Sequence, residues 1–244
     1  MNHEKRYGRF TSSEIHKLVK KGRSKADVFS APGKTYIFNK MMEREIKRST
    51  NQDIFSRPIA WGHLMEVYAD KELPLNYERV STDTKVHPEY DFWAGTPDYF
   101  VKKDNKVVGI AELKGYGLER HFKYAKTINE GNVEKLKANH PDEYWQIVSN
   151  ACIYDVNIGV AMAFCPNSEL LEKIQKDLEE TNILEANDLD PWKYRWVTEE
   201  KKSNLNWIDH GPTSMLSVFE FEIPQEDKDF ITERVILANE TLLL

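Results

Sequence analysis

Two carboxylates and a lysine interrupt a predicted pair of apolar strands. Glu112 and Lys114 lie at the end of the second strand, and Asp98 stands where the first strand begins. Side chains alternate along a strand, so Glu112 and Lys114 share one face, and Asp98 can reach that face across the pair. Two converging carboxylates suit a hard divalent cation, while a neighbouring ammonium can orient or deprotonate a water and offset charge on a phosphate. The spacing therefore predicts metal-assisted chemistry at phosphate.

A surface ion pair on an edge strand is the alternative interpretation of Glu112 and Lys114. Residues 99–101 and 107–111 are rich in β-branched and aromatic side chains, and the polar residues 102–106 predict the hairpin turn between them. The charges thus interrupt a hydrophobic strand, where burying them is costly unless they are paired or bind a metal. This context favours a functional, metal-binding site over a surface ion pair.

Further elements predict a mixed α/β fold around the hairpin. We expect the other strands over residues 77–80, around 86, and over 158–165, 192–197 and 215–223. We expect helices over about 10–19, 35–47, 58–69, 141–154, 168–180 and 225–243. The expected architecture is a mixed central β-sheet flanked by helices, with an N-terminal helical segment.

Several connections are also predicted. Residues 31–34, Ala-Pro-Gly-Lys, indicate a loop, and the polar, lysine-rich residues 115–139 indicate a helix with a mobile loop beside the charged strand end. Residues 158–165 are continuously apolar, which is typical of a strand buried on both faces. Together with the helix over 141–154, that strand predicts a strand–helix–strand crossover.

Length and charge limit the possible organisation. The 244 residues predict one domain, with a basic helical part over about 1–58, a core over about 59–165, and C-terminal strands and a helix over about 166–244. Residues 1–48 carry 13 lysines and arginines against five acids, a net charge of +8, which leaves −14 on the rest of the chain. A basic face on an acidic body suits a protein that grips a polyanion at one place, although a solvated helical face is the alternative.

The cysteines and the hydropathy pattern exclude other classes. Cys152 and Cys165 are isolated in apolar surroundings, which favours structural thiols in a reducing cytoplasm, and two cysteines cannot supply the four ligands of an iron–sulfur cluster. No apolar run approaches the roughly 20 residues of a membrane span. We therefore expect a cytoplasmic protein with no membrane partner.

Taken in order, the motifs resemble those of the PD-(D/E)xK nuclease superfamily, and more narrowly of the lambda-exonuclease-like (YqaJ-type) phage recombination exonucleases. The resemblance covers about residues 10–165 and rests on six motifs: Phe10-Thr-Ser-Ser-Glu-Ile-His, Lys21-Gly-Arg23-Ser, Ala60-Trp-Gly-His-Leu-Met-Glu66, Thr96-Pro-Asp98, Glu112-Leu-Lys114 and Tyr144-Trp-Gln146. It implies a restriction-endonuclease-like core. The segment over 198–212 matches nothing in this pattern.

The resemblance also implies roles for the motif residues. Asp98 and Glu112 would be metal ligands, helped by the Leu113 carbonyl, and Lys114 would be the catalytic lysine. Glu66 would complete the acidic cluster, either through water or on a second ion.

Two further roles are implied by the resemblance alone. Gln146 would position the lysine, the water or the DNA backbone. Arg23, with Thr96 and Ser13, would form an anion pocket for a 5′-phosphate.

The expected function is a Mg²⁺-dependent 5′→3′ exonuclease that acts on double-stranded DNA ends in phage-type recombination, with Mn²⁺ as a substitute. The resemblance further implies a homotrimeric ring and a single-strand annealing protein as partner. A structure-specific or restriction-like endonuclease with the same core is the first alternative. A non-catalytic DNA-binding protein of this fold is the second, and the complete set of Glu66, Asp98, Glu112 and Lys114 weighs against it.

Overall fold

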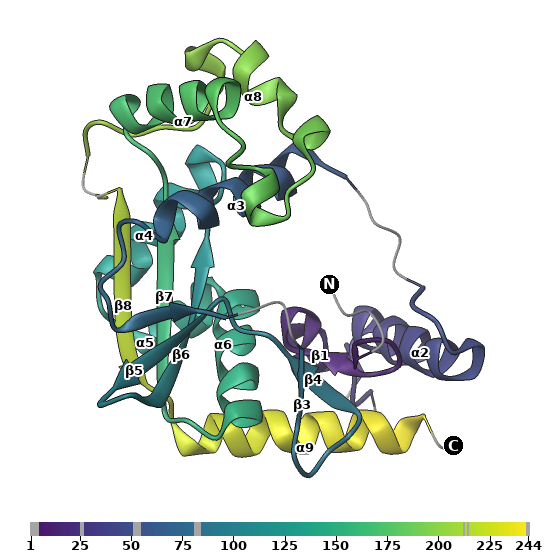
Figure 1. Cartoon of the computed structure of the whole chain (residues 1–244). Helices are drawn as coiled ribbons and strands as arrows, with labels where there is room; N and C mark the ends of the chain where they lie inside the picture. Colours follow the sequence, from purple (N-terminus) through teal and green to yellow (C-terminus); the bar gives the residue numbers. More distant parts are fainter. Residues whose placement is uncertain are drawn as a thin grey trace.

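A five-stranded mixed sheet forms the centre of the molecule (Figure 1). The computed structural model describes residues 5–24, 27–50, 55–80, 84–211, 213 and 215–242. The strand order is β2-β5-β6-β7-β8, and the bounds are Tyr77–Arg79, Tyr99–Lys103, Lys106–Lys114, Ile158–Phe164 and Leu216–Glu222. Three short strands form a second sheet in the order β1-β4-β3, with bounds Phe10–Thr11, Trp93–Gly95 and Lys85–Val86. The predicted mixed α/β architecture is therefore confirmed.

The hairpin of β5 and β6 has a tighter turn than the sequence predicts. Only Asp104 and Asn105 connect the two strands, and both have positive φ, at 50° and 61°. A two-residue turn with φ > 0 at both positions matches the right-handed twist of the strands, and Asp and Asn tolerate this conformation. The turn pairs Lys103 with Lys106, and a register shift of one residue between Val101 and Lys102 then places Tyr99 opposite Ala111, so the start of β5 lies beside the end of β6.

Strands β6 and β7 are parallel, and three helices connect them: α4 (Leu118–Asn129), α5 (Val133–Asn139) and α6 (Pro141–Tyr154). The register pairs Glu112 with Ala161 and Lys114 with Ala163. The predicted crossover is present, and the stretch predicted as a helix with a loop holds two helices.

Side chains of β7 alternate between two hydrophobic cores. Ala161 and Ala163 belong to the core that includes buried residues of α4 and α6. Val160, Met162 and Phe164 belong to the opposite core, with α3 (Arg57–Ala69) and α7 (Ser168–Glu180). This alternation confirms the prediction that β7 is buried on both faces.

The remaining helices extend the structure on either side of the sheet. In Figure 1, α3, α7 and α8 lie in the upper part of the molecule, α9 runs below the sheet, and α2 lies to the right of its lower half, so the ribbon has the outline of a C. The other α-helices are α1 His16–Val19, α2 Ala31–Ile46, α8 Arg195–Glu199 and α9 Gln225–Thr241. Short 3-10 helices, labelled η, are η2 Ser12–Glu14, η3 Glu185–Asn187, η4 Pro191–Lys193 and η5 Lys202–Asn204. Among the described residues, no helix is long and apolar enough to cross a bilayer.

Two of the local predictions are wrong, and a third is wrong in part, because the helix expected over about 10–19 begins with strand β1 and a 3-10 turn and is α-helical only over His16–Val19. Residues 31–34 form the first turn of α2, because Pro32 needs no hydrogen-bond partner there and Ser30 Oγ accepts from the Gly33 amide at 3.4 Å. Residues 192–197 are not a strand but the turn η4 followed by α8. Pro191 starts this turn and Asp190 caps it, and Tyr194, Trp196 and Val197 then pack in the core that includes α3, whereas Trp192 is exposed.

Candidate active site

The end of β6 and the start of β5 bring together the three charged residues that the sequence analysis singled out. Lys114 Nζ lies 3.3 Å from Glu112 Oε2 and 4.0 Å from Asp98 Oδ2. The Leu113 amide donates to Asp98 Oδ2 at 2.8 Å. The Glu112 side chain is fully buried, whereas those of Lys114 and Asp98 are 19% and 25% exposed. The cluster is thus open to solvent on the side of Lys114 and Asp98.

Helix α6 fixes the buried carboxylate of Glu112. Gln146 Nε2 donates to Glu112 Oε2 at 2.6 Å, and Asn150 Nδ2 donates to Glu112 Oε1 at 2.6 Å. The two amides are four residues apart and therefore lie on one helical face. Sequence reasoning assigned a role to Gln146 and missed Asn150. A second amide one turn later, in an otherwise apolar stretch, was the available signal.

Glu66 approaches this cluster from α3, on the opposite face of the sheet. Burial, followed by the charge of Asp98, raises the pKa of Glu66 from an ordinary 4.5 to about 8. Arg79 Nη2 lies 3.5 Å from Glu66 Oε2 and partly offsets this effect. Glu66 is thus electrostatically part of the cluster, although it shares no hydrogen bond with Asp98 or Glu112 in the described part of the chain.

The pKa values of Glu112 and Lys114 indicate that an additional positive charge would stabilise this cluster. Burial and the neighbouring Asp98 raise the pKa of Glu112 well above its usual range. Burial lowers the pKa of Lys114, but Glu112 and Asp98 outweigh that effect, and the net pKa lies above its ordinary value. Lys114 is therefore an ammonium at neutral pH, and its single charge faces the carboxylates of Asp98, Glu112 and Glu66.

These residues fit a hard divalent cation that keeps part of its water shell. Nowhere in the described ranges do three or more His, Cys, Asp or Glu side chains form a ready metal-binding group. Asp98 and Glu112 nevertheless offer carboxylate oxygens at one place, and Mg²⁺ is commonly held by only one or two carboxylates with several waters. A bound cation would also offset the burial and the charge of Asp98 that together raise the pKa of Glu112 and Glu66.

The residues expected to bind a terminal phosphate share no hydrogen bond with one another in the described part of the chain. Ser13 is exposed and accepts from Arg6 Nη2 at 3.4 Å. Thr96 Oγ1 donates to Thr84 Oγ1 at 3.2 Å. Arg23 is exposed between α1 and α2, and has no hydrogen bond or ion pair among the described residues. The guanidinium beside Ser13 is therefore that of Arg6, which the sequence analysis did not single out.

A buried hydrogen-bond cluster joins the Ser13 segment to α6. Ser12 Oγ lies 2.8 Å from Ser149 Oγ, and Trp93 Nε1 donates to the same Ser149 hydroxyl at 2.9 Å. Gly95 lies against this cluster, because a Cβ there would fall 2.3 Å from Ser12 Oγ and 2.1 Å from Asn150 Oδ1. The helix that holds Glu112 therefore also holds the turn that carries Ser13.

Comparison with known proteins places this site in a family. The model of the YqaJ-like viral recombinase domain matches residues 3–155, and this range contains Glu66, Asp98, Glu112, Lys114 and Gln146. The chain belongs to the YqaJ-like viral recombinase family. The predicted family resemblance is thereby confirmed, and since this is a nuclease family the protein is an enzyme of the nuclease class.

Solved exonuclease structures share the fold of this YqaJ-like protein. The alkaline exonuclease LHK-Exo from Laribacter hongkongensis matches with a TM-score of 0.62 and 12% identity, over 98% of this chain and 90% of that one. The same enzyme in complex with dAMP matches with a TM-score of 0.62, 13% identity and the same coverage. A phage-related exonuclease from Haemophilus somnus 129PT matches with a TM-score of 0.57 and 15% identity, over 96% and 93% of the two chains. No curated protein sequence matches the chain.

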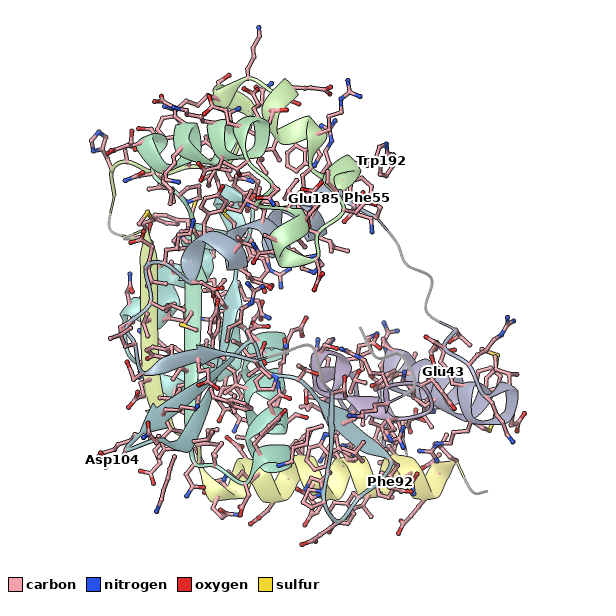
Figure 2. The ribbon with its side chains drawn as sticks, in the orientation of Figure 1. Glu43, Phe55, Phe92, Asp104, Glu185 and Trp192 are labelled. Atoms are coloured by element: carbon pink, nitrogen blue, oxygen red, sulfur yellow. The ribbon has the colours of Figure 1, made fainter. Side chains whose placement is uncertain are left out.

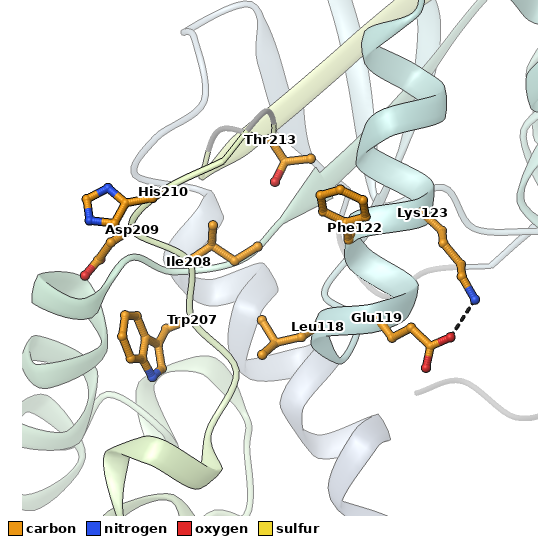
Figure 3. Close-up of a pocket in the computed structure, with 9 residues that line it drawn as sticks. All are labelled: Leu118, Glu119, Phe122, Lys123, Trp207, Ile208, Asp209, His210 and Thr213. Atoms are coloured by element: carbon orange, nitrogen blue, oxygen red, sulfur yellow. Dashed lines mark hydrogen bonds and ion pairs between the residues drawn. The ribbon is translucent and has the colours of Figure 1, made fainter.

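Residues of the segment over 198–212, which matched no family motif, line a pocket apart from the carboxylate cluster. Trp207 and Ile208 face Leu118 and Phe122 of α4 around a cavity of about 630 Å³ (Figure 3). Its lining is mainly apolar, and none of the predicted site residues belongs to it. In this YqaJ-like protein the segment thus covers α4 and stays apart from the carboxylate cluster.

The raised pKa of Glu66 predicts that the metal-free protein becomes less stable as the pH rises. Between pH 4.5 and about 8 the folded state keeps a proton on Glu66 that the unfolded state releases, so the free energy of unfolding falls across this window. We expect Glu66→Gln to remove part of this fall, on the order of 2 kcal/mol after allowance for partial exposure. Urea unfolding in EDTA at several pH values measures it.

The exposed Glu72→Gln variant is the control for this experiment, because Glu72 lies three residues beyond the end of α3. It should follow the wild-type pH dependence. An equally steep fall in Glu66→Gln and wild type would contradict the coupling of Glu66 to Asp98.

Proposed function

We propose that this YqaJ-like protein is a Mg²⁺-dependent 5′→3′ exonuclease that degrades one strand of double-stranded DNA from its end, in phage-type homologous recombination. The arrangement of Asp98, Glu112 and Lys114 at one strand end carries the proposal, because it combines carboxylate oxygens with a fixed ammonium. The solved LHK-Exo complex with dAMP supports a nucleoside monophosphate as the product class.

Each residue of the cluster has a role in this proposal. Asp98 and Glu112 hold the cation, with the Leu113 carbonyl as a further oxygen, and Glu66 binds through water or a second ion. Mg²⁺, or Mn²⁺ as a substitute, supplies Lewis acidity and a more acidic bound water. Lys114 is protonated and offsets the negative charge that develops on the scissile phosphate.

The amides of α6 act by holding Glu112. Gln146 and Asn150 each donate to one oxygen of that carboxylate, so its orientation is set before substrate arrives. A carboxylate held in this way loses little freedom when it binds a cation, and the cost of ordering the site is met during folding.

The assembly proposed for this enzyme follows from the family. We propose that the whole chain acts as one nuclease domain, that three copies form a ring around duplex DNA, and that a single-strand annealing protein receives the exposed strand. The duplex end is the substrate in this arrangement, and phosphate contacts explain why no base-reading motif is needed.

The proposal is tested by the form of DNA that is degraded. Linear duplex with a 5′-phosphate should be digested in Mg²⁺ much faster than linear duplex with a 5′-hydroxyl, and closed circles should survive. Efficient cutting of closed circles would favour the alternative, a structure-specific or restriction-like endonuclease. No cleavage of any form in Mg²⁺ or Mn²⁺ would favour a non-catalytic DNA-binding protein.

Two matched arginine variants locate the terminal-phosphate pocket. Arg6 contacts Ser13, whereas Arg23 was expected to hold the phosphate together with Ser13 and Thr96. The variant that lacks the phosphate-binding guanidinium should lose the preference for 5′-phosphorylated ends, by about tenfold for one charge-assisted contact. Comparing initial rates on both ends for Arg6→Ala and Arg23→Ala decides between them. If both variants keep the wild-type preference, neither residue forms the pocket.

A further inference from the structure

A polar pocket, separate from the apolar one beside α4, lies between the N-terminal loop, the end of α2 and the end of α9. Its volume is about 510 Å³, and its lining includes Gly8, Arg9, Arg44, Lys47, Asp91 and Asn239. None of these residues belongs to the carboxylate cluster or contacts Ser13. Figure 2 labels two nearby residues, Glu43 on α2 and Phe92 near α9, in the lower part of the molecule. Three basic side chains face one acid in this pocket.

Two consecutive residues of α2 hold the wall of the pocket in place. The Gly8 amide donates to Glu43 Oε2 at 2.8 Å, and the Gly8 carbonyl accepts from Arg44 Nε at 2.6 Å. Gly8 has a φ of 68°, and a Cβ there would lie 2.6 Å from Arg44 Cγ, so only glycine fits. Arg44 Nη1 also donates to Asn239 Oδ1 of α9 at 2.8 Å. The pocket is therefore built by long-range contacts.

One donor of the Arg44 guanidinium is left without a partner. Arg44 Nη2 is buried and makes no hydrogen bond to any described residue. Neither Arg44 nor Lys47 forms an ion pair within the described part of the chain. A buried donor without an acceptor is destabilising, and an arginine presents its donors as a fork that matches two oxygens of one anion.

The other buried basic residues of the chain differ from Arg44. Lys40 donates to Glu43, Lys228 donates to Asn157 and to the Val156 carbonyl, and Arg234 donates to two main-chain carbonyls. Each of them is satisfied by the protein itself. Arg44 instead combines an unused donor with a polar cavity and a second basic side chain, Lys47, on the same wall.

We propose that this pocket binds a phosphoryl oxyanion, either free phosphate or a backbone phosphate of duplex DNA. The Arg44 guanidinium lines the pocket and has one donor, Nη2, that no described residue accepts, and Lys47 supplies positive charge beside it. Asp91 also lines the pocket, and its main-chain carbonyl accepts from Arg9 Nε at 2.6 Å, so we expect the anion beside Arg44 and Lys47. Binding of free phosphate at this pocket would hold whether or not the protein is the proposed exonuclease, whereas binding of the DNA backbone rests on the proposed function.

The first test is a calorimetric titration of inorganic phosphate into the metal-free protein. We expect Lys47→Gln to weaken binding at this site by about tenfold, the loss typical of one charge-assisted contact. Lys106→Gln, an exposed lysine at the start of β6, should bind as the wild type does. Arg44→Lys keeps the charge and loses the fork, and it should weaken binding if it folds. Since Arg44 also has structural contacts, the exposed Lys47 keeps the test decisive.

Arg6→Ala separates this pocket from the one proposed beside Ser13. It should leave the Lys47-dependent binding unchanged. Phosphate binding that is equal in wild type, Lys47→Gln and Arg44→Lys would overturn the proposal, and so would the absence of any binding of phosphate or DNA.

The second test distinguishes the two sources of phosphate. A duplex closed by a hairpin at each end offers backbone phosphates but no terminal one, and its affinity without metal is measured by fluorescence anisotropy at several salt concentrations. If the pocket holds the DNA backbone, Lys47→Gln should weaken duplex binding and reduce the salt slope by about one. If Lys47→Gln weakens the binding of free phosphate and leaves the affinity for the duplex unchanged, the pocket binds the free ion. Failure of the nuclease assays alters neither measurement.

Discussion

Lys114→Ala is expected to lower the rate of DNA cleavage by about 10²–10⁴-fold while leaving the fold and the affinity for DNA nearly unchanged. The ammonium lies 3.3 Å from Glu112 and 4.0 Å from Asp98, at the solvent-open side of the cluster. In the proposed reaction its charge is needed most when negative charge accumulates on the phosphate. Removing it therefore affects the transition state more than the bound substrate.

Single-turnover cleavage of linear duplex in Mg²⁺ measures this effect, and anisotropy in Ca²⁺ or EDTA measures the affinity. Lys106→Ala is the matched control, since it removes a lysine from the other, exposed end of the same strand. It should cleave at the wild-type rate. A Lys114→Ala protein that keeps more than about a tenth of the wild-type rate would exclude the proposed role of Lys114.

Asp98→Asn and Glu112→Gln are expected to weaken Mg²⁺ binding by at least about tenfold each and to abolish cleavage with it. Even residues that only orient a metal ligand cost 10–100-fold in metal affinity when they are replaced. Each substitution removes one negative charge and keeps the size of the side chain. In Glu112→Gln, an amide also replaces an acceptor between two donors, Gln146 and Asn150, so a lower melting temperature is expected as well.

Calorimetric titration with Mg²⁺ and Mn²⁺ is the measurement for both variants. Glu78→Gln is the control, because Glu78 is exposed on the neighbouring strand β2 and pairs with Lys102. Its metal affinity should equal that of the wild type. Unchanged metal affinity in both Asp98→Asn and Glu112→Gln would show that the cation binds elsewhere.

Local sequence patterns predicted the centre of the fold well. The hairpin, the apolar strand β7 and the amphipathic helix α7 follow from side-chain periodicity, and the structure contains all three. The charged ends of β5 and β6 meet as predicted, because the position of Asp98 relative to Glu112 depends only on a short antiparallel pair. Local geometry was sufficient there.

Predictions failed where a cap or a distant contact decides the structure. Residues 192–197 have β-forming side chains, yet Asp190 and Pro191 start a helical turn, after which Tyr194 and Val197 are buried in the core that includes α3. The short strand β4 was missed because two of its three residues, Ala94 and Gly95, have low strand propensity, and its partners β1 and β3 come from elsewhere in the chain.

The surroundings of Ser13 show a similar limit at the level of the site. The motif suggested Arg23 as a phosphate-binding residue, which stays a prediction, and it gave no sign that Arg6 contacts Ser13. The contact depends on how the N-terminal loop folds back onto α2, through Gly8, Glu43 and Arg44, and no local pattern reports that path. Asn150 was missed for a related reason, since its partner Glu112 is 38 residues away.

Helix α6 restricts how the sequence can change. Three of its residues make two separate sets of hydrogen bonds. Gln146 and Asn150 bind Glu112, while Ser149 binds Ser12 and Trp93. One residue inserted between Gln146 and Asn150 would rotate everything beyond it by about 100°. If the insertion precedes Ser149, Ser149 and Asn150 would lose their contacts together, and only Gln146 would still hold Glu112. An insertion before His140, ahead of the helix, would leave this phase untouched. Related sequences should therefore vary in length on the α5 side of this helix and keep the spacing within it.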